Sequence, residues 1–189
     1  MARNYTLKKR AEQQAETRQR IVDAAIVLHT EIGPSKTTFS MVADKAGVQR
    51  HTLYAHFPDE RSLVMACSAH MQEKSPPPDA APWRGIKNRR ERLTAGLAEI
   101  YGWFEANAQL LSSVLRDAEH YALVQEVSKL RYAPAIGLWH EVLEAGLKDK
   151  QRAMVSLALS FYTWRTLTRD SGLKTSAAVT QMVDAIESA

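Results

Sequence analysis

The sequence predicts an all-α protein with an N-terminal three-helix head, which contains a helix-turn-helix, and a C-terminal helical body. Apolar residues recur at helical spacing through most of the 189 residues. The chain holds only 8 glycines and 7 prolines, fewer than usual, which favours long helices over turns. Two short amphipathic segments meet at Gly47, the layout of a helix-turn-helix. A proline cluster from Pro76 to Pro82 cannot lie inside a helix and therefore separates head from body.

The composition excludes several classes of protein. A hydrophobic share of 45% argues against disorder. No apolar run approaches the roughly 20 residues of a membrane helix, and no apolar stretch follows the basic N-terminus as it does in a signal peptide. The single cysteine, Cys67, rules out an internal disulfide and is expected to be a core residue. We therefore expect a cytoplasmic protein with no membrane partner.

The helices of the head can be placed from their start and stop signals. The first is expected from about Thr17 to Glu31, where Gly33-Pro34 follows it. Its buried stripe should comprise Ile21, Ala25, Leu28 and Ile32. Asp59 is expected to cap the helix that follows the helix-turn-helix, with Leu63 facing inward.

The prediction of a helix-turn-helix is based on the side chains at the ends of its two short helices and on their apolar spacing. Thr38 can cap the first short helix, because its hydroxyl accepts a bond from an early backbone N–H. Gly47 suits the left-handed conformation that ends that helix. Leu53 and Phe57, four residues apart, give the second short helix a buried edge.

The other face of the second short helix carries hydrogen-bond donors and rings. Its members are Gln49, Arg50, His51, Thr52, Tyr54 and His56. Such side chains contact phosphates and base edges when a recognition helix lies in the major groove of DNA. The same face is also compatible with an ordinary solvated surface. His51 and His56 are five residues apart and make a poor metal pair, so no metal and no cofactor is predicted.

The segment from Thr17 to about Ala66 resembles the DNA-binding region of the TetR family of bacterial transcriptional regulators (TetR/AcrR-like). The matching residues in chain order are Ile21, Ala24, Ala25, Gly33, Thr37-Thr38, Val42-Ala43, Ala46-Gly47-Val48, Thr52-Leu53-Tyr54, His56-Phe57-Pro58 and Leu63. The resemblance covers about fifty residues and is loose in the C-terminal part. It implies a ligand-responsive DNA-binding regulator, most often a repressor, that binds a palindromic operator in double-stranded DNA as a homodimer.

Two positions depart from the family pattern. Gln49 stands where a better capping residue is common before the recognition helix. Glu60 stands where the family often has a Lys that reaches a phosphate, and Arg61 follows it. We therefore expect that Arg61 makes this phosphate contact or that the contact is absent. The predicted DNA-binding residues are Thr38, Gln49, Arg50, His51, Thr52, Tyr54, His56 and Arg61.

The domain boundaries follow from charge and proline content. Residues 1–16 form a basic N-terminal arm, 17–74 the DNA-binding domain with its connecting helix, 75–83 a Pro-rich loop, and 84–189 the helical regulatory and dimerisation domain. Counterion release at DNA would favour contact by the arm, although a solubilising tail without a partner has the same composition.

In the body, a helix expected over about residues 150–169 is apolar on two sides. Such a helix must bury both sides, against its own subunit and a partner, or wholly within one subunit. The resemblance implies that the last two long helices pair two copies. The predicted dimer-interface residues are Leu157, Phe161, Trp164, Leu167, Val179, Met182, Val183 and Ile186.

Large rings and a few polar side chains in the body suggest a site for a small-molecule inducer. The candidates are Trp103, Phe104, Arg116, His120, Trp139, His140, Phe161, Tyr162 and Arg165. Rings at helical spacing are equally typical of an ordinary hydrophobic core.

A DNA-bound factor that organises chromosomes or acts through a protein partner, with no inducer, is the alternative function. The sequence has no phosphate loop, His-Glu-x-x-His or paired-cysteine zinc spacing, so an enzyme is not predicted.

Overall fold

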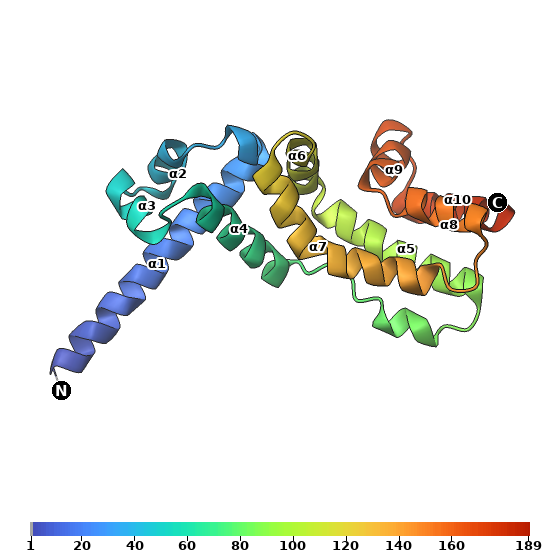
Figure 1. Ribbon diagram of the computed structural model, residues 1–189, viewed down its shortest axis with the longest axis horizontal. Coiled ribbons are helices and arrows are strands. Elements are labelled where there is room, and N and C mark those ends of the chain that lie inside the picture. The colour runs from blue at the N-terminus through green and yellow to red at the C-terminus, as the bar shows by residue number, and fades with distance from the viewer. Residues whose placement is uncertain (1) are drawn as a thin grey trace. The chain divides into compact units, whose positions relative to one another are not determined.

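A computed structural model of the chain describes residues 2–189, with side chains from Lys8 onwards, and these residues form helices and no β-strand (Figure 1). The prediction of an all-α protein is confirmed. The described chain packs as two compact units. Unit 1 contains the residues up to Lys74 together with Gln109–Arg131, and unit 2 contains Ser75–Ala108 and Tyr132–Ala189. None of the described helices combines the length and the apolar character needed to cross a membrane.

Unit 1 is built around the N-terminal helices. Its elements are α1 (Ala2–Glu31), the 3-10 turn η1 (Pro34–Lys36), α2 (Phe39–Ala46), α3 (Arg50–His56), α4 (Glu60–Lys74), most of α6 (Ala108–Ala118) and the first part of α7 (Ala122–Leu143). The buried core of the first four helices comprises Ile21, Val22, Ala24, Ala25, Leu28, Val42, Ala43, Ala46, Leu53, Phe57, Leu63 and Cys67. The predicted stripe of α1 is confirmed, with Ile32 partly buried against this core.

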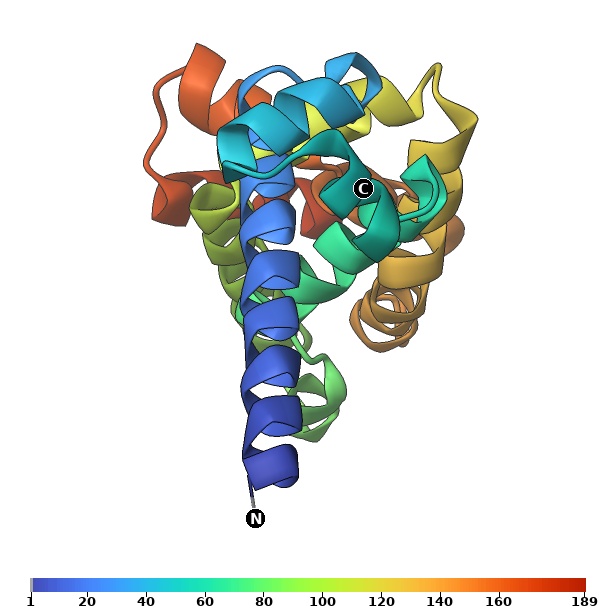
Figure 2. The same ribbon diagram turned by 90° about the vertical axis from the view of Figure 1, so that its left-hand side faces the viewer.

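The helix α1 begins earlier than predicted. It starts at Ala2 instead of Thr17, and its N-terminal part extends beyond α2–α4 in both views (Figures 1 and 2). Residues 2–16 contain no Gly or Pro and consist mostly of Ala, Lys, Arg, Gln and Glu, which all favour helix. The basic segment therefore continues the first helix, and its residues 8–16 are exposed.

The predicted helix ends of the helix-turn-helix are confirmed. The Thr38 hydroxyl accepts a hydrogen bond from the Met41 N–H at 3.3 Å. Gly47 ends α2 in the left-handed conformation, with φ 63° and ψ 40°. Gln49 precedes α3 without a capping bond from its side chain. The Asp59 carboxylate accepts a bond from the Ser62 N–H at 2.7 Å and so caps α4.

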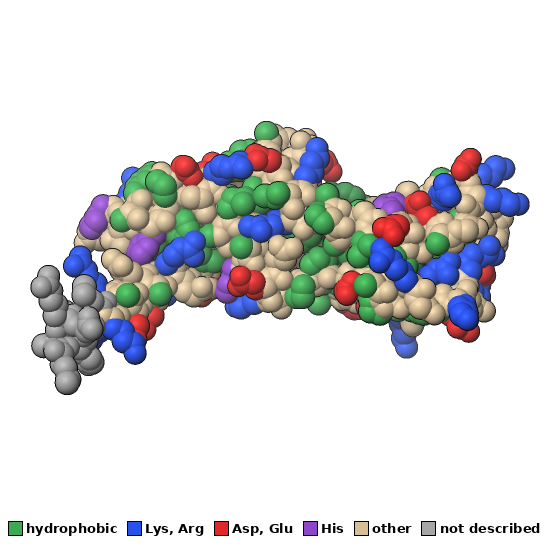
Figure 3. Space-filling view, turned by 60° about the horizontal axis from the view of Figure 1, so that its bottom comes forward, with side chains coloured by type: hydrophobic (Ala, Val, Ile, Leu, Met, Phe, Trp, Pro, Cys, Tyr) green, Lys and Arg blue, Asp and Glu red, His purple; other side chains and the backbone are tan. Residues whose placement is uncertain are grey.

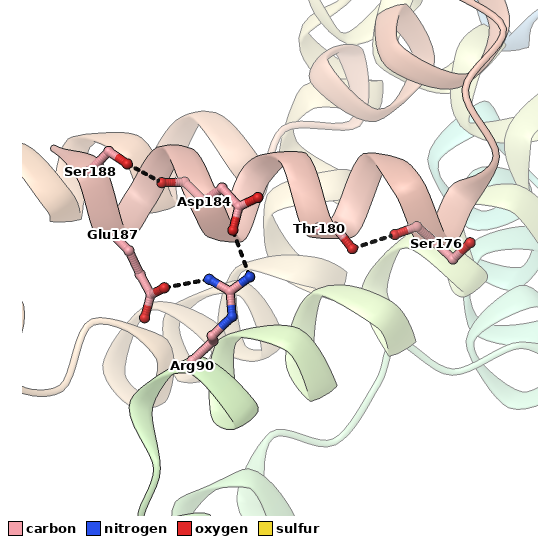
Figure 4. A network of polar contacts seen from close by, with 6 residues as sticks. All are labelled: Arg90, Ser176, Thr180, Asp184, Glu187 and Ser188. Carbon is pink, nitrogen blue, oxygen red and sulfur yellow. Dashed lines mark hydrogen bonds and ion pairs between the residues drawn. The ribbon is translucent and has the colours of Figure 1, made fainter.

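Unit 2 is also built from helices. Its elements are the 3-10 turn η2 (Ala81–Gly85), α5 (Arg89–Ala106), the remainder of α7, α8 (Asp149–Ala158), α9 (Phe161–Arg165), the π-helical η3 (Thr166–Asp170) and α10 (Thr175–Ser188). The helix α5 packs against α10, and Arg90 at its start donates to Asp184 at 2.6 Å and to Glu187 (Figure 4). Gly96 lets Leu143 and Trp83 approach α5 closely, because a Cβ there would meet Leu143 Cδ2 at 2.7 Å.

The helix predicted over residues 150–169 is interrupted. The helix α8 ends at Ala158, and Ser160 has an extended conformation with φ −73° and ψ 128°. A new helix starts at Phe161, and the Ser160 carbonyl accepts a bond from the Trp164 N–H. Leu157 is therefore not on a continuous face with Phe161 and Trp164, and its side chain is 50% exposed.

The Pro-rich loop is held by side chains of unit 2. The indole N–H of Trp103 donates to the Ser75 carbonyl at 3.0 Å, and that of Trp139 donates to the Pro78 carbonyl at 2.8 Å. The Asn107 amide adds a bond to the Ser75 hydroxyl at 2.9 Å. These three bonds add to the restriction that the prolines already place on the backbone of this loop.

Candidate nucleic-acid interface

The helix α3 presents a polar face whose opposite edge lies in the core of unit 1. Leu53 is 0% exposed and Phe57, directly after the helix, is 1% exposed. Burial of this edge fixes which side chains of α3 face outward. Gln49, Arg50, His51 and Tyr54 are exposed, and Thr52 and His56 are half-buried. The face therefore offers amide, guanidinium, imidazole, hydroxyl and phenol groups at one surface, all able to contact phosphates or base edges.

Two side chains of this face contact α2. The Arg50 guanidinium donates a hydrogen bond to the Ser40 hydroxyl. The Tyr54 ring packs against Phe39 with 5.1 Å between ring centroids. Both contacts hold α3 against α2 at a fixed angle. The sequence prediction missed Phe39 and Ser40, although Phe39, directly after the capping Thr38, is an apolar residue at the start of a helix.

One basic side chain of α1, that of Arg18, contacts the end of α3. The Arg18 guanidinium lies 4.9 Å from the centroid of the Phe57 ring, a cation–π distance. Lys8, Lys9, Arg10 and Arg20 are exposed on the same helix. At the left of Figure 3, where α2 and α3 lie in Figure 1, histidine side chains and Lys or Arg side chains share the surface. Such a surface attracts a polyanion.

Arg61, at the start of α4, is already paired. Both of its terminal nitrogens donate to the Glu126 carboxylate of α7 at 2.7 Å. This bond raises the pKa of Arg61 and lowers that of Glu126. Both side chains are about half exposed, so water competes with the pair. To contact a phosphate, Arg61 would have to exchange one anionic partner for another.

The ring candidates for a ligand site lie together in unit 2. Trp103 packs against Phe104 at 5.7 Å and against Trp139 at 6.2 Å between centroids. Phe104 meets Phe161 edge-on at 5.5 Å, and Phe161 meets Tyr162 at 5.9 Å. Phe104, Trp139 and Phe161 are buried, Trp103 is half-buried and Tyr162 is exposed. We call these five rings the aromatic cluster.

The polar candidates for that site are more scattered. Arg165 is exposed and lies over the Tyr162 ring at 5.5 Å. His140 is hydrogen-bonded to Glu144 at 2.6 Å. Arg116 and His120 belong to unit 1, where His120 is exposed and Arg116 bonds to its neighbour Asp117. Arg165 thus contacts a ring of the aromatic cluster.

Most of the predicted dimer-interface side chains are buried in the chain's own unit 2. The buried members are Phe161, Trp164, Val179, Met182, Val183 and Ile186. Leu157 is exposed and Leu167 is half-buried. These six buried side chains therefore belong to the core of unit 2.

Comparison with known proteins identifies the helix-turn-helix. Residues 21–67 match the family profile described as bacterial regulatory proteins, tetR family. SrpR of Pseudomonas putida, an HTH-type transcriptional regulator, is 34% identical over 92 residues, which are 49% of this chain and 43% of SrpR. TtgW, an uncharacterized HTH-type transcriptional regulator from a strain of Pseudomonas putida, is 33% identical over 92 residues, which are 49% of this chain and 68% of TtgW.

The likeness extends to solved structures. The transcriptional regulator FadR from Bacillus subtilis, crystallised in complex with stearoyl-CoA, has a TM-score of 0.62 at 14% identity, covering 89% of this chain and 96% of FadR. Identity at this level shows a shared fold alone. The matched segment spans less than half the length of SrpR but over two thirds of TtgW. The family profile on the helix-turn-helix and the match to these regulators show that the chain belongs to the TetR family of bacterial transcriptional regulators.

Proposed function

We propose that the protein represses transcription by binding a palindromic DNA operator as a homodimer, and that a small molecule releases it. The observation that carries the proposal is the outward polar face of α3 on a helix whose other edge is buried. One short helix reads few base pairs. Two copies about 34–36 Å apart would read successive major-groove faces, which gives dimerisation a functional reason.

The proposed inducer is a largely apolar small molecule that contacts the aromatic cluster. In support, the neighbouring Trp164 is fully buried, and its indole nitrogen has no hydrogen-bond partner among the described residues. A buried donor without a partner is costly, so a ligand acceptor there would be favoured. FadR, which shares the fold, was crystallised with stearoyl-CoA, a ligand with a long apolar chain. Such a molecule would act only if it bound the DNA-incompetent state more tightly.

Selection of bound sequences from a random DNA pool tests the proposal. A palindrome with two half-sites about one helical turn apart is expected. Recovery of no enriched sequence would contradict DNA reading, and a single asymmetric site would contradict the symmetric dimer. A scan of melting temperature against small apolar molecules then separates an inducible regulator from a factor without an inducer, because a ligand bound only by the folded state stabilises it.

Replacing Arg50 with alanine is expected to weaken binding to the selected operator by about 1–3 kcal/mol if the guanidinium contacts a guanine. Affinity for random DNA should change little, because base contacts contribute nothing there. Competition titrations with the two DNAs measure both effects. Arg84→Ala is a matched control, since Arg84 is an exposed arginine of unit 2. An equal loss on both DNAs would show that Arg50 touches only phosphate.

Removing residues 1–10 is expected to lower the salt dependence of DNA binding. Lys8, Lys9 and Arg10 are exposed on α1, and the log–log salt slope should fall by roughly 0.9 for every phosphate that the deleted side chains neutralise. Binding isotherms at several salt concentrations measure the slope. Glutamine at the exposed Lys148, Lys150 and Arg152 of unit 2 provides the control. An unchanged slope after the deletion would show that the N-terminal segment does not contact phosphates.

A further inference from the structure

Three side chains of α6 form hydrogen bonds with backbone groups in and around the turn between α1 and α2. The Ser113 hydroxyl donates to the Thr30 carbonyl at 3.0 Å, and an Arg116 nitrogen donates to the Ile32 carbonyl at 3.2 Å. The Asp117 carboxylate accepts the Ser35 N–H at 2.8 Å. Carbonyls at the end of a helix lack partners within that helix. The helix α6 therefore supplies the cap that α1 and η1 do not provide for themselves.

Asp117 is the centre of this group. Its side chain is 1% exposed, and its second oxygen accepts from the Arg116 Nε at 2.9 Å. Burial alone would raise the pKa of Asp117, but the bonds from Ser35 and Arg116 keep that pKa below its ordinary value. A buried carboxylate bonded to a backbone N–H and a guanidinium has its position well defined.

The turn is shaped to admit this carboxylate. Gly33 has φ +96°, and a Cβ at that position would lie 2.3 Å from Arg116 Nη2 and 2.5 Å from the Asp117 carboxylate. Only glycine gives both the backbone conformation and the space. Thr37 and Thr38 follow η1 directly, and Thr38 caps α2. The path of residues 33–35 thus sets where α2 begins.

We propose that Asp117 is a positioning residue for DNA recognition: by fixing the turn at Gly33–Ser35, it sets the place of α2 and, through the Arg50–Ser40 and Tyr54–Phe39 contacts, that of α3. This inference rests on the proposed DNA-binding function. Because its side chain is 1% exposed, Asp117 would act through the turn and not by contacting DNA itself. A recognition helix that is displaced by about 1 Å loses base contacts, whereas basic side chains can still follow the phosphates.

The test compares operator and random DNA for Asp117→Ala and Asp117→Asn at a temperature where circular dichroism shows each variant folded. Asp117→Ala is expected to lose about tenfold or more in operator affinity, since a buried hydrogen bond to a charged group is removed. Its affinity for random DNA should stay within about twofold. Asp117→Asn, which keeps one oxygen for the Ser35 N–H, should bind the operator more tightly than Asp117→Ala. Asp23→Ala, which removes an exposed carboxylate of α1 in the same unit, should match the wild type.

The outcomes separate the two claims. A wild-type protein that binds no selected DNA contradicts the proposed function itself. Wild-type binding with an unchanged ratio of operator to random affinity in folded Asp117→Ala contradicts the positioning role. An equal loss on both DNAs in a folded variant also contradicts it, because that pattern indicates general damage to the unit. Should Asp117→Ala fail to fold, the ratio for Asp117→Asn decides by the same criterion.

Discussion

Replacing Leu53 with alanine is expected to lower the free energy of unfolding of unit 1 by about 2–5 kcal/mol and to abolish operator binding. Leu53 is the only fully buried side chain of α3, a helix of 7 residues. So short a helix has little stability of its own and is held by its packing. Loss of the leucine would leave a cavity under the polar face of α3 and weaken the packing of this helix against α1 and α2.

Urea unfolding followed by circular dichroism measures the change in stability, and titration with the operator measures binding. Leu130→Ala is the matched control, because Leu130 lies in the same unit and is 55% exposed. Its expected effect is within about 0.5 kcal/mol. If Leu53→Ala unfolded at the same urea concentration as Leu130→Ala, the buried edge of α3 would not be what anchors the helix.

The head of the molecule was predictable because its signals are local. Thr38, Gly47 and Asp59 act on backbone groups within a few residues of themselves, and each adopts the role expected from its chemistry. Leu53 and Phe57 follow helical spacing and are buried as predicted. These features depend on side-chain type and near neighbours, so a single sequence contains the information.

Other features depend on partners distant in the chain. Glu126 lies 65 residues from Arg61, and Asp117 lies 82 residues from Ser35. No spacing rule links such pairs. Asp117 could have been noticed in the sequence, because it continues the apolar stripe that includes Leu111 and Val114. A carboxylate at such a position is expected to be buried and to have hydrogen-bond partners.

The body was less predictable for a different reason. Periodicity shows that Phe161 and Trp164 are apolar positions of a helix, but the same pattern fits a subunit core and a dimer interface. The interruption between α8 and α9 at Ser160, where the backbone is extended, contains no Gly or Pro that would have predicted it. Packing of α9 against α5 decides the burial of both rings, and that packing is set by the whole of unit 2.

The buried His29 is expected to make the folding stability depend on pH in mildly acidic solution. Burial lowers the pKa of His29 from 6.5 to about 4, even though the nearby Asp117 charge acts to raise it. Between these values the unfolded chain binds a proton that the folded chain does not. The free energy of unfolding should therefore fall by about 3 kcal/mol as the pH drops from about 6.5 to about 4, with no contribution from this group above pH 6.5.

Urea midpoints measured between about pH 4 and pH 7.5 report the slope, which linkage assigns to protons taken up on unfolding. His29→Gln should flatten this part of the profile, although the variant is expected to be less stable at neutral pH, because a packed buried ring is removed. His51→Gln, which removes an exposed histidine of the same unit, is the matched control for the loss of one imidazole. The same slope in His29→Gln and in the wild type would mean that another group takes up the proton, and would place the acid sensitivity of the fold outside the contact between α1 and α6.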